Sequence, residues 1–287
     1  MPAFLFISGY FAKYNPQKIL GKIFLPYVLF QVVYRLFIEY VLIKSSEQIK
    51  IQFTSPTWVL WYLMALFFFY LLLPLFKTDK LYTALTLIII LVFISLISGF
   101  DSGVNSFLSF SRTLVFLPFF IAGNYTNHFE IKSRIKEHRL FLLIFSASIV
   151  LMWEVFFYIF EVPIKIMYAS ENYGTDTNLI APRFMFLCCA TYWILFLLTA
   201  FTDKKIPFIS KIGQNTISIF LLHAFIVSLI IKNNWLQEDS ISNIVIVFLV
   251  SAAMTGLLSL IPVNKMLDAI DKLIKNSPVI YGKQKGK

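Results

Sequence analysis

Charged residues are scarce in this chain. Only 14% of its 287 residues are Asp, Glu, Lys or Arg, whereas 59% are hydrophobic. A soluble domain carries about 25% charged residues and cannot hide so much apolar surface, so the composition excludes that class and predicts an integral membrane protein. The mean hydropathy of +0.77 and the 32 phenylalanines agree with lipid-facing helices. The net charge of +10 is therefore interpreted through its placement in loops, and nucleic acid is not expected as a partner.

Cysteines and common catalytic motifs are scarce as well. The two cysteines, Cys188 and Cys189, are adjacent within an apolar run, so they form neither a disulfide framework nor a zinc signature. The chain has no Walker loop, no dinucleotide-binding glycine pattern, no HExxH and no GxSxG. Enzymes that depend on those motifs are excluded, and no metal site is expected.

Long apolar runs predict an all-α polytopic membrane helix bundle, with one transmembrane domain over residues 1–287. The apolar segment Met1–Ala12 comes first and covers as a helix about 18 Å, against a hydrocarbon core of about 30 Å. It makes a poor signal peptide because it has no charged n-region. We therefore expect an N-terminal half-helix, which is either a re-entrant or interfacial segment or is preceded by a lost span. Eight full spans are predicted to follow, at 21–43, 57–76, 81–98, 110–127, 139–160, 182–201, 212–231 and 242–262.

The loops alternate in charge, which predicts their orientation. By the positive-inside rule the basic loops face the cytoplasm, so Lys13 and the C-terminus are expected inside a cell membrane. The longest non-helical stretch, 161–181, then lies outside, where its length indicates a function. The basic tail 263–287 is expected at the anionic inner leaflet. The basic loops hold Lys13, Lys18, Lys22, Lys77, Lys80, Lys132, Arg134, Lys136, Arg139, Lys204, Lys205, Lys211, Lys265, Lys272, Lys275, Lys283, Lys285 and Lys287.

Several charged side chains stand at membrane depth, where each needs a physical reason. Arg35 and Glu39 are four positions apart on one helix, which favours a structural ion pair. Arg112 opens its span and either reaches the interface or binds a phosphate or carboxylate bidentately. For Arg183, which follows Pro182, reaching the interface is the favoured interpretation.

A histidine and two tryptophans also have two interpretations each. His223 lies about eleven residues into its span and is a base, a proton relay or, the favoured alternative without context, a hydrogen-bonded structural group. Trp58 and Trp61 begin the 57–76 span, where an aromatic belt is favoured over a stacking platform for a sugar. Glu154 is either a buried acid or an interfacial one.

Five segments occur in a recognisable order along the chain. They are MPAFLFISGYF (1–11), LPY (25–27), WVLWYLMAL (58–66), RTLVFLPFFIAG (112–123) and GQNTISIFLLH (213–223). Together they resemble the integral-membrane acyltransferase-3 family, especially its fucose-4-O-acetylase-like sugar O-acetyltransferases. The resemblance implies a bundle of about ten helices that moves acetyl from cytoplasmic acetyl-CoA to a sugar hydroxyl of a cell-surface or exported polysaccharide.

The resemblance also implies roles for individual residues. Arg112, with Arg183, would bind the acyl donor or an anionic substrate, and Trp58 and Trp61 would flank the acceptor, a glycan or a lipid-linked sugar. His223 would line the cavity and is the catalytic candidate in this chain. Besides the glycan or lipid-linked sugar, membrane lipid is the expected partner. The family's first helix normally carries a basic residue near its start and a histidine near its end, taken to be the catalytic base.

No helix of that kind is found in this sequence. We therefore predict that the chain as given is inactive or weakly active, and that a version extended upstream by about one span is active. Equal acetylation by the two would contradict this.

Three other functions stay open at the level of sequence. A transporter or flippase for lipid-linked glycans would explain the spans and arginines, but not the five ordered segments, and no pair of broken helices in two halves is apparent. A glycan polymerase would also use a long outer loop with arginines, and a non-catalytic remnant would lack transfer altogether. Dependence on acetyl-CoA separates the acyltransferase from these alternatives.

Overall fold

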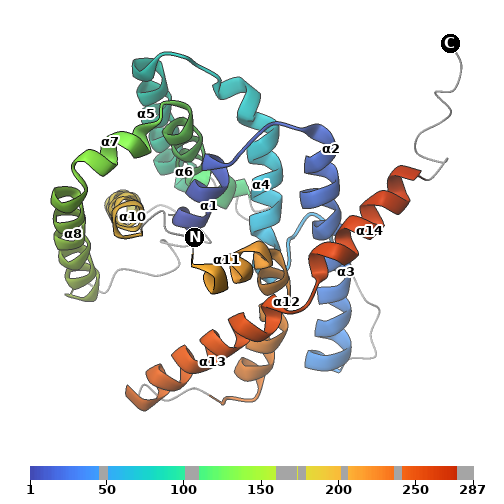
Figure 1. The fold of residues 1–287 in the computed structure, drawn as a ribbon. Coiled ribbons are helices and arrows are strands. Elements are labelled where there is room, and N and C mark those ends of the chain that lie inside the picture. The colour runs from blue at the N-terminus through green and yellow to red at the C-terminus, as the bar shows by residue number, and fades with distance from the viewer. Residues whose placement is uncertain are drawn as a thin grey trace, which may run out of the picture. The chain divides into compact units, whose positions relative to one another are not determined.

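The computed structural model describes residues 1–44, 51–100, 110–159, 173, 179–201, 206–235 and 241–276. This part of the chain is helical and contains no strand (Figure 1). It confirms the predicted all-α polytopic bundle. The elements are α1 (Pro2–Tyr10), α2 (Pro16–Ile19), η1 (Leu20–Phe24), α3 (Leu25–Phe37), η2 (Ile38–Ile43), η3 (Trp58–Leu60), α4 (Trp61–Leu72), η4 (Leu73–Phe76), α5 (Leu81–Ile97), η5 (Ser98–Phe100), α6 (Phe110–His128), α7 (Ile131–Glu137), α8 (Arg139–Ile159), α10 (Ile180–Ala200), α11 (Pro207–Gln214), α12 (Thr216–Lys232), α13 (Ile241–Ser259) and α14 (Val263–Asn276).

Most of the predicted spans are helices that are long and apolar enough to cross a membrane. The described residues contain six such stretches, and the pair α11 and α12, bent by 71° at their junction, makes a seventh. The remaining predicted span is α6, which has the length but carries Ser111, Arg112 and Asn124 and is buried along most of its sequence. A helix surrounded by other helices needs less apolar surface than one that faces lipid. The six stretches are Pro16–Ile43, Trp58–Phe76, Leu81–Phe100, Arg139–Phe156, Ile180–Ala200 and Asn243–Lys272.

The chain forms two compact units. The first consists of Met1–Asn15 and Ala65–Asp203, and the second of Pro16–Met64 and Lys204–Lys287. The chain passes from the second unit to the first within α4. Each unit therefore combines segments that are distant in sequence, inside the single transmembrane domain that the sequence predicts.

In the first unit, α6 is the central helix. Helices α1 and α5 pack against it, and α10 packs against both α1 and α8 (Figure 1). The backbones of α1 and α6 touch because glycine stands at both crossing points: a Cβ on Gly9 would overlap the carbonyl oxygen of Phe120, and one on Gly123 that of Phe6. The side-chain amide of Asn124 adds a long hydrogen bond, 3.5 Å, to the carbonyl oxygen of Gly9.

In the second unit, α12 contacts α3, η3, α13 and α14. The strongly amphipathic α14 buries Val263 and Leu267 and turns acidic residues toward η1. Lys22 Nζ lies 3.6 Å from Asp268 Oδ1 there, and Gly21 leaves room for the carboxylate of Asp271. These contacts join the C-terminal helix to the beginning of the second unit.

Candidate functional site

His223 is a half-buried side chain on α12 with a defined hydrogen bond. Its Nδ1 lies 3.0 Å from the carbonyl oxygen of Ile219, one turn earlier in the same helix. A carbonyl oxygen only accepts, so Nδ1 donates and carries the proton, and in the neutral ring Nε2 is the basic nitrogen. Within the described residues no hydrogen bond reaches Nε2. This hydrogen bond within the helix favours the tautomer in which Nε2 can accept a proton.

The other two histidines have a different environment. His128, at the end of α6, is exposed and has its Nε2 3.4 Å from Asp79 Oδ1. His138 is exposed next to α7. Of the three histidines in the chain, His223 is therefore the one that lies in the middle of an apolar helix.

Aromatic rings join α3, η3 and α12 around this part of the second unit. The ring of Tyr34 lies 4.7 Å from that of Phe225 and 5.2 Å from that of Trp58. Phe37 contacts the same two rings, at 4.9 and 6.3 Å. The Tyr34 hydroxyl donates a 2.5 Å hydrogen bond to the carbonyl oxygen of Leu221, two positions before His223. This cluster fixes the segment of α12 that carries the histidine.

The two candidate tryptophans pack inside the protein. Trp58 is half-buried in the aromatic cluster, and Trp61 is 7% exposed. This differs from the aromatic belt that the sequence favoured, because belt residues face the lipid headgroups. A role of Trp58 and Trp61 in sugar stacking stays a prediction.

Gln31 on α3 is a buried polar residue that the sequence interpretation missed. Its side chain is fully buried, and Nε2 donates to the carbonyl oxygens of Gln52 at 2.6 Å and Ser55 at 2.9 Å. Its Oε1 accepts the backbone N–H of Thr57 at 3.0 Å. One side chain thereby satisfies three backbone groups of the segment that precedes η3.

This segment leads directly into a strained position. Trp58 has a φ of 47°, in the left-handed region that costs a residue with a Cβ about 1–2 kcal/mol. The hydroxyl of Tyr27 donates to the carbonyl oxygen of Phe53 and adds a second attachment to α3. The bonds from Gln31 and Tyr27 hold the segment that presents Trp58. The sequence does contain a signal for Gln31, because a single glutamine in an apolar helix is a polar group at membrane depth. The same argument selected His223.

Arg112 and Arg183 occupy equivalent places in the first unit. Each lies in the first turn of its helix, α6 or α10, and one turn later the rings of Phe116 and Phe186 contact each other at 6.5 Å. This ring contact joins α6 and α10 one turn beyond each arginine. A cation in a first turn opposes the helix dipole by about 0.3–1 kcal/mol, whereas an anion is favoured there. The helix dipole therefore does not explain why arginine stands at these two positions.

Arg183 does not reach the interface as the sequence favoured. It is 0% exposed, and its guanidinium lies 4.8 Å from the ring centroid of Tyr173. The backbone N–H of Tyr173 donates to the carbonyl oxygen of Gly99 at 2.7 Å, and a side chain at Gly99 would overlap the tyrosine ring. Burial raises the pKa of Tyr173, although the charge of Arg183 acts in the opposite direction, so the ring is neutral when it faces the cation.

The contact between Arg183 and Tyr173 attaches the predicted outer loop to α10. Tyr173 belongs to the stretch 161–181, of which only residues 173 and 179–181 fall within the described part of the chain. The predicted function of this stretch as a whole therefore lies outside the described residues. Direct binding of a substrate by Arg183 stays a prediction.

The structure also locates the other charged residues that the sequence analysis placed at membrane depth. In the described structure Arg35 and Glu39 form no ion pair, and Arg35 Nε is buried without a hydrogen-bond partner. Glu39 lies in the π-helical turn η2, where the 3.6-residue spacing that brings i and i+4 together no longer holds. Glu154 is exposed and accepts a 3.1 Å hydrogen bond from Trp193 Nε1, as expected of an interfacial acid.

Comparison with known families accounts for the order of the five segments described in the sequence analysis. A family model described as an acyltransferase domain matches residues 1–261. The chain belongs to the acyltransferase-3 family. No curated protein and no solved structure matched the chain. The family match covers the segments of both units from α1 through α13 and establishes a membrane acyltransferase.

The candidate residues of this acyltransferase are divided between the two units. Arg112 and Arg183 belong to the first unit, whereas Trp58, Trp61 and His223 belong to the second. Each group is positioned by contacts within its own unit. Tyr173 packs on Arg183 in the first unit, and in the second unit the aromatic cluster and the hydrogen bonds of Gln31 position Trp58.

Replacing Gln31 with leucine is expected to destabilise the acyltransferase. The substitution leaves three backbone groups without their partner; the N–H of Thr57 is buried, and a buried group left unsatisfied costs about 1–3 kcal/mol, whereas the part-buried carbonyls of Gln52 and Ser55 cost less. We expect a melting temperature in detergent lower by several degrees, together with altered tryptophan fluorescence. Gln52→Ala is the matched control, since it removes an exposed amide and keeps the carbonyl that Gln31 binds. An equal loss in both variants would contradict the assigned role of Gln31.

Proposed function

We propose that this acyltransferase transfers an acetyl group from acetyl-CoA to a hydroxyl of a sugar in a cell-surface or exported glycan. The observation that carries the proposal is the geometry of His223, whose Nδ1 donates to Ile219 while Nε2 remains basic. The histidine ends the segment GQNTISIFLLH, one of those that resemble sugar O-acetyltransferases. Family membership supports acyl transfer. The identity of the donor as acetyl-CoA and of the acceptor as a sugar hydroxyl is what we propose.

The reaction needs only a proton acceptor and groups that hold two substrates. Nε2 of His223 takes the proton of the sugar hydroxyl while its oxygen attacks the thioester carbonyl. The new C–O bond forms, the C–S bond breaks, and the CoA thiolate leaves and is protonated. The product is an O-acetyl ester, and no redox step is involved.

The remaining candidates would hold the substrates. Arg112, in the first turn of α6, would bind a phosphate of the donor or a carboxylate of an acidic acceptor, and Arg183, in the first turn of α10, would contribute further positive charge. Trp58 and Trp61 would flank the sugar, whose apolar face stacks on aromatic rings. Such an enzyme would lie in the cell membrane with Lys13 and the C-terminus in the cytoplasm, where acetyl-CoA is available.

The direct test is acetyl transfer in membranes that contain the chain. Membranes would be incubated with acetyl-CoA labelled in its acetyl group and with a lipid-linked glycan fraction, and label in the glycan would be counted before and after mild alkali. We expect alkali-labile label, at the low rate that the sequence analysis predicts for this chain, that depends on both the chain and acetyl-CoA, with control membranes lacking the chain giving none. Transport of a lipid-linked glycan across vesicles without acetyl-CoA, and no labelled ester, would overturn the proposal and favour a flippase.

A further inference from the structure

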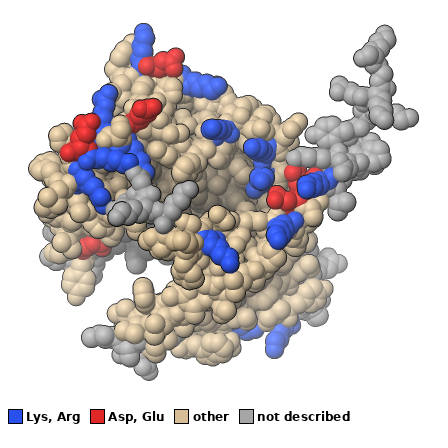
Figure 2. Space-filling model, in the orientation of Figure 1, with Lys and Arg blue, Asp and Glu red and all other residues tan. Residues whose placement is uncertain are grey.

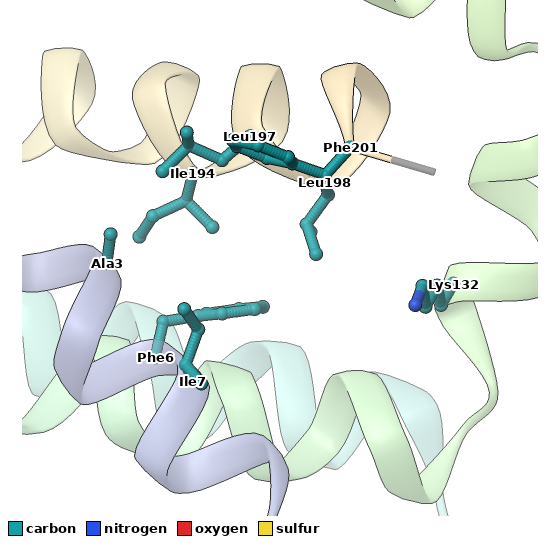
Figure 3. A pocket seen from close by; sticks show the side chains of 8 residues that line it. All are labelled: Ala3, Phe6, Ile7, Lys132, Ile194, Leu197, Leu198 and Phe201. Carbon is teal, nitrogen blue, oxygen red and sulfur yellow. The ribbon is translucent and has the colours of Figure 1, made fainter. Parts of the chain in front are cut away.

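The first unit contains a groove that the acyl-transfer candidates do not use. Its cavity volume is about 300 Å³, at the lower end of the range for ligand sites. Figure 3 shows one wall formed by α1 and the facing wall by the end of α10, with a lysine at one end. The residues that define it are Ala3, Phe6, Ile7, Leu197, Leu198 and Lys132.

The lining of the groove combines two kinds of chemistry. Seven of its eight residues are apolar, and the single polar group is the amine of Lys132 on α7. Apolar walls suit an alkyl chain, and an ammonium at the end of such a groove suits one anionic group. The amine carries three N–H donors, so a phosphate oxygen can be added to the contacts that Lys132 already makes.

The charge around Lys132 favours an anionic partner. Helix α7 also carries Arg134 and Lys136, and Arg139 follows it, whereas Glu130 precedes the helix and Glu137 ends it, so that residues 130–139 carry a net charge of +2 with His138 neutral. Figure 2 shows Lys and Arg side chains on this side of the first unit with Asp and Glu side chains among them. The positive-inside rule places such a loop at the cytoplasmic leaflet, whose anionic lipids attract basic segments near the membrane.

We infer that the groove between α1 and α10 binds one acyl chain of an anionic phospholipid, with the headgroup phosphate on Lys132. Two other occupants fit less well. The acyl donor of the proposed reaction carries an acetyl group too short to occupy the groove, and its several phosphates would meet only one lining cation. An extended peptide segment would bring unpaired backbone N–H and C=O groups to walls that offer one polar partner. The inference does not depend on the proposed acetyl transfer.

Native mass spectrometry of the full chain in mild detergent tests the headgroup contact. Phosphatidylglycerol and phosphatidylcholine with the same acyl chains would be added in equal amounts. We expect one phosphatidylglycerol to be retained with at least a 10-fold preference, and Lys132→Glu to lower that preference about 10-fold. Lys136→Glu is the control, because Lys136 lies on the same helix but does not line the groove. Equal retention of the two lipids, or an equal effect of both variants, would overturn the inference.

A second pair of variants tests the acyl-chain contact. Leu198→Trp places a bulky ring in the groove, whereas Leu195→Trp makes the same change on α10 outside the lining. We expect the first to abolish retention and the second to preserve it, with both proteins melting alike before lipid is added. If Leu198→Trp does not fold, Ala3→Leu serves as the groove-filling variant. Unchanged retention in a folded groove-filling variant, or displacement of the phospholipid by a long-chain acyl-CoA, would contradict the assignment.

Discussion

Replacing Gly123 with alanine is expected to separate α1 from α6 and to destabilise the first unit severely. The added methyl group would overlap the carbonyl oxygen of Phe6 and lie 2.9 Å from the backbone nitrogen of Tyr10. Both neighbours are backbone atoms of α1, which cannot rotate away as a side chain can. We therefore expect a loss of about 3 kcal/mol or more, at the upper end of the range for overpacked sites. Thermal unfolding and size-exclusion chromatography in detergent would measure the loss.

Two further glycine variants make this prediction specific. Gly9→Ala should have a similar effect, because its methyl group would overlap the carbonyl oxygen of Phe120 from the other helix. Gly256→Ala, on α13, is the control: among the described residues no atom outside the adjacent backbone of the same helix lies within 4 Å of the added carbon, and alanine favours a helix by up to about 1 kcal/mol. Equal melting temperatures for Gly123→Ala and Gly256→Ala would show that the close approach of α1 and α6 does not limit stability.

Replacing His223 with glutamine is expected to lower kcat/KM for acetyl transfer by about 10²–10⁴-fold, the usual contribution of a general base. Glutamine is similar in size and retains an amide that can donate to the carbonyl oxygen of Ile219. Folding should therefore be preserved while the proton acceptor is lost. Initial rates with labelled acetyl-CoA would measure the effect, and His128→Gln, at an exposed site, is the matched control.

Chemical rescue separates a base from a structural histidine. The substitution His223→Ala removes the imidazole ring and leaves a cavity, in which added imidazole can accept the proton of the sugar hydroxyl. We expect imidazole to restore part of the activity of His223→Ala and to leave His223→Gln unchanged. A rate for His223→Gln within a few-fold of the unsubstituted protein would show that another group removes the proton.

The helices were predictable because apolar length is a local property of the sequence. The predicted spans 57–76 and 182–201 correspond to helical segments with ends shifted by no more than two residues. The exception concerns α6, which was expected to be an ordinary span. Its polar residues lower its apolarity, and it is stable because other helices cover it, a relation that depends on the folded arrangement.

The site was less predictable because its geometry depends on distant partners. The sequence placed His223 in mid-helix, but only the structure shows that Ile219 holds its Nδ1. Arg183 was expected to reach the interface, because nothing in its own helix indicates that Tyr173 would cover it. Gln31 carries no spacing signal, since its partners are backbone groups more than twenty positions away.

The glycine crossing of α1 and α6 also sets a delay during biosynthesis. The hydrogen bond from Asn124 to Gly9 joins residues 115 positions apart. At about 5–20 residues per second, the ribosome needs about 6–23 s to produce the second partner after the first. Throughout this interval the surface of α1 at Gly9 has no complementary helix, and other small-residue surfaces can bind it. The yield of folded protein should therefore respond to translation speed between α1 and α6 more than to speed in the C-terminal third.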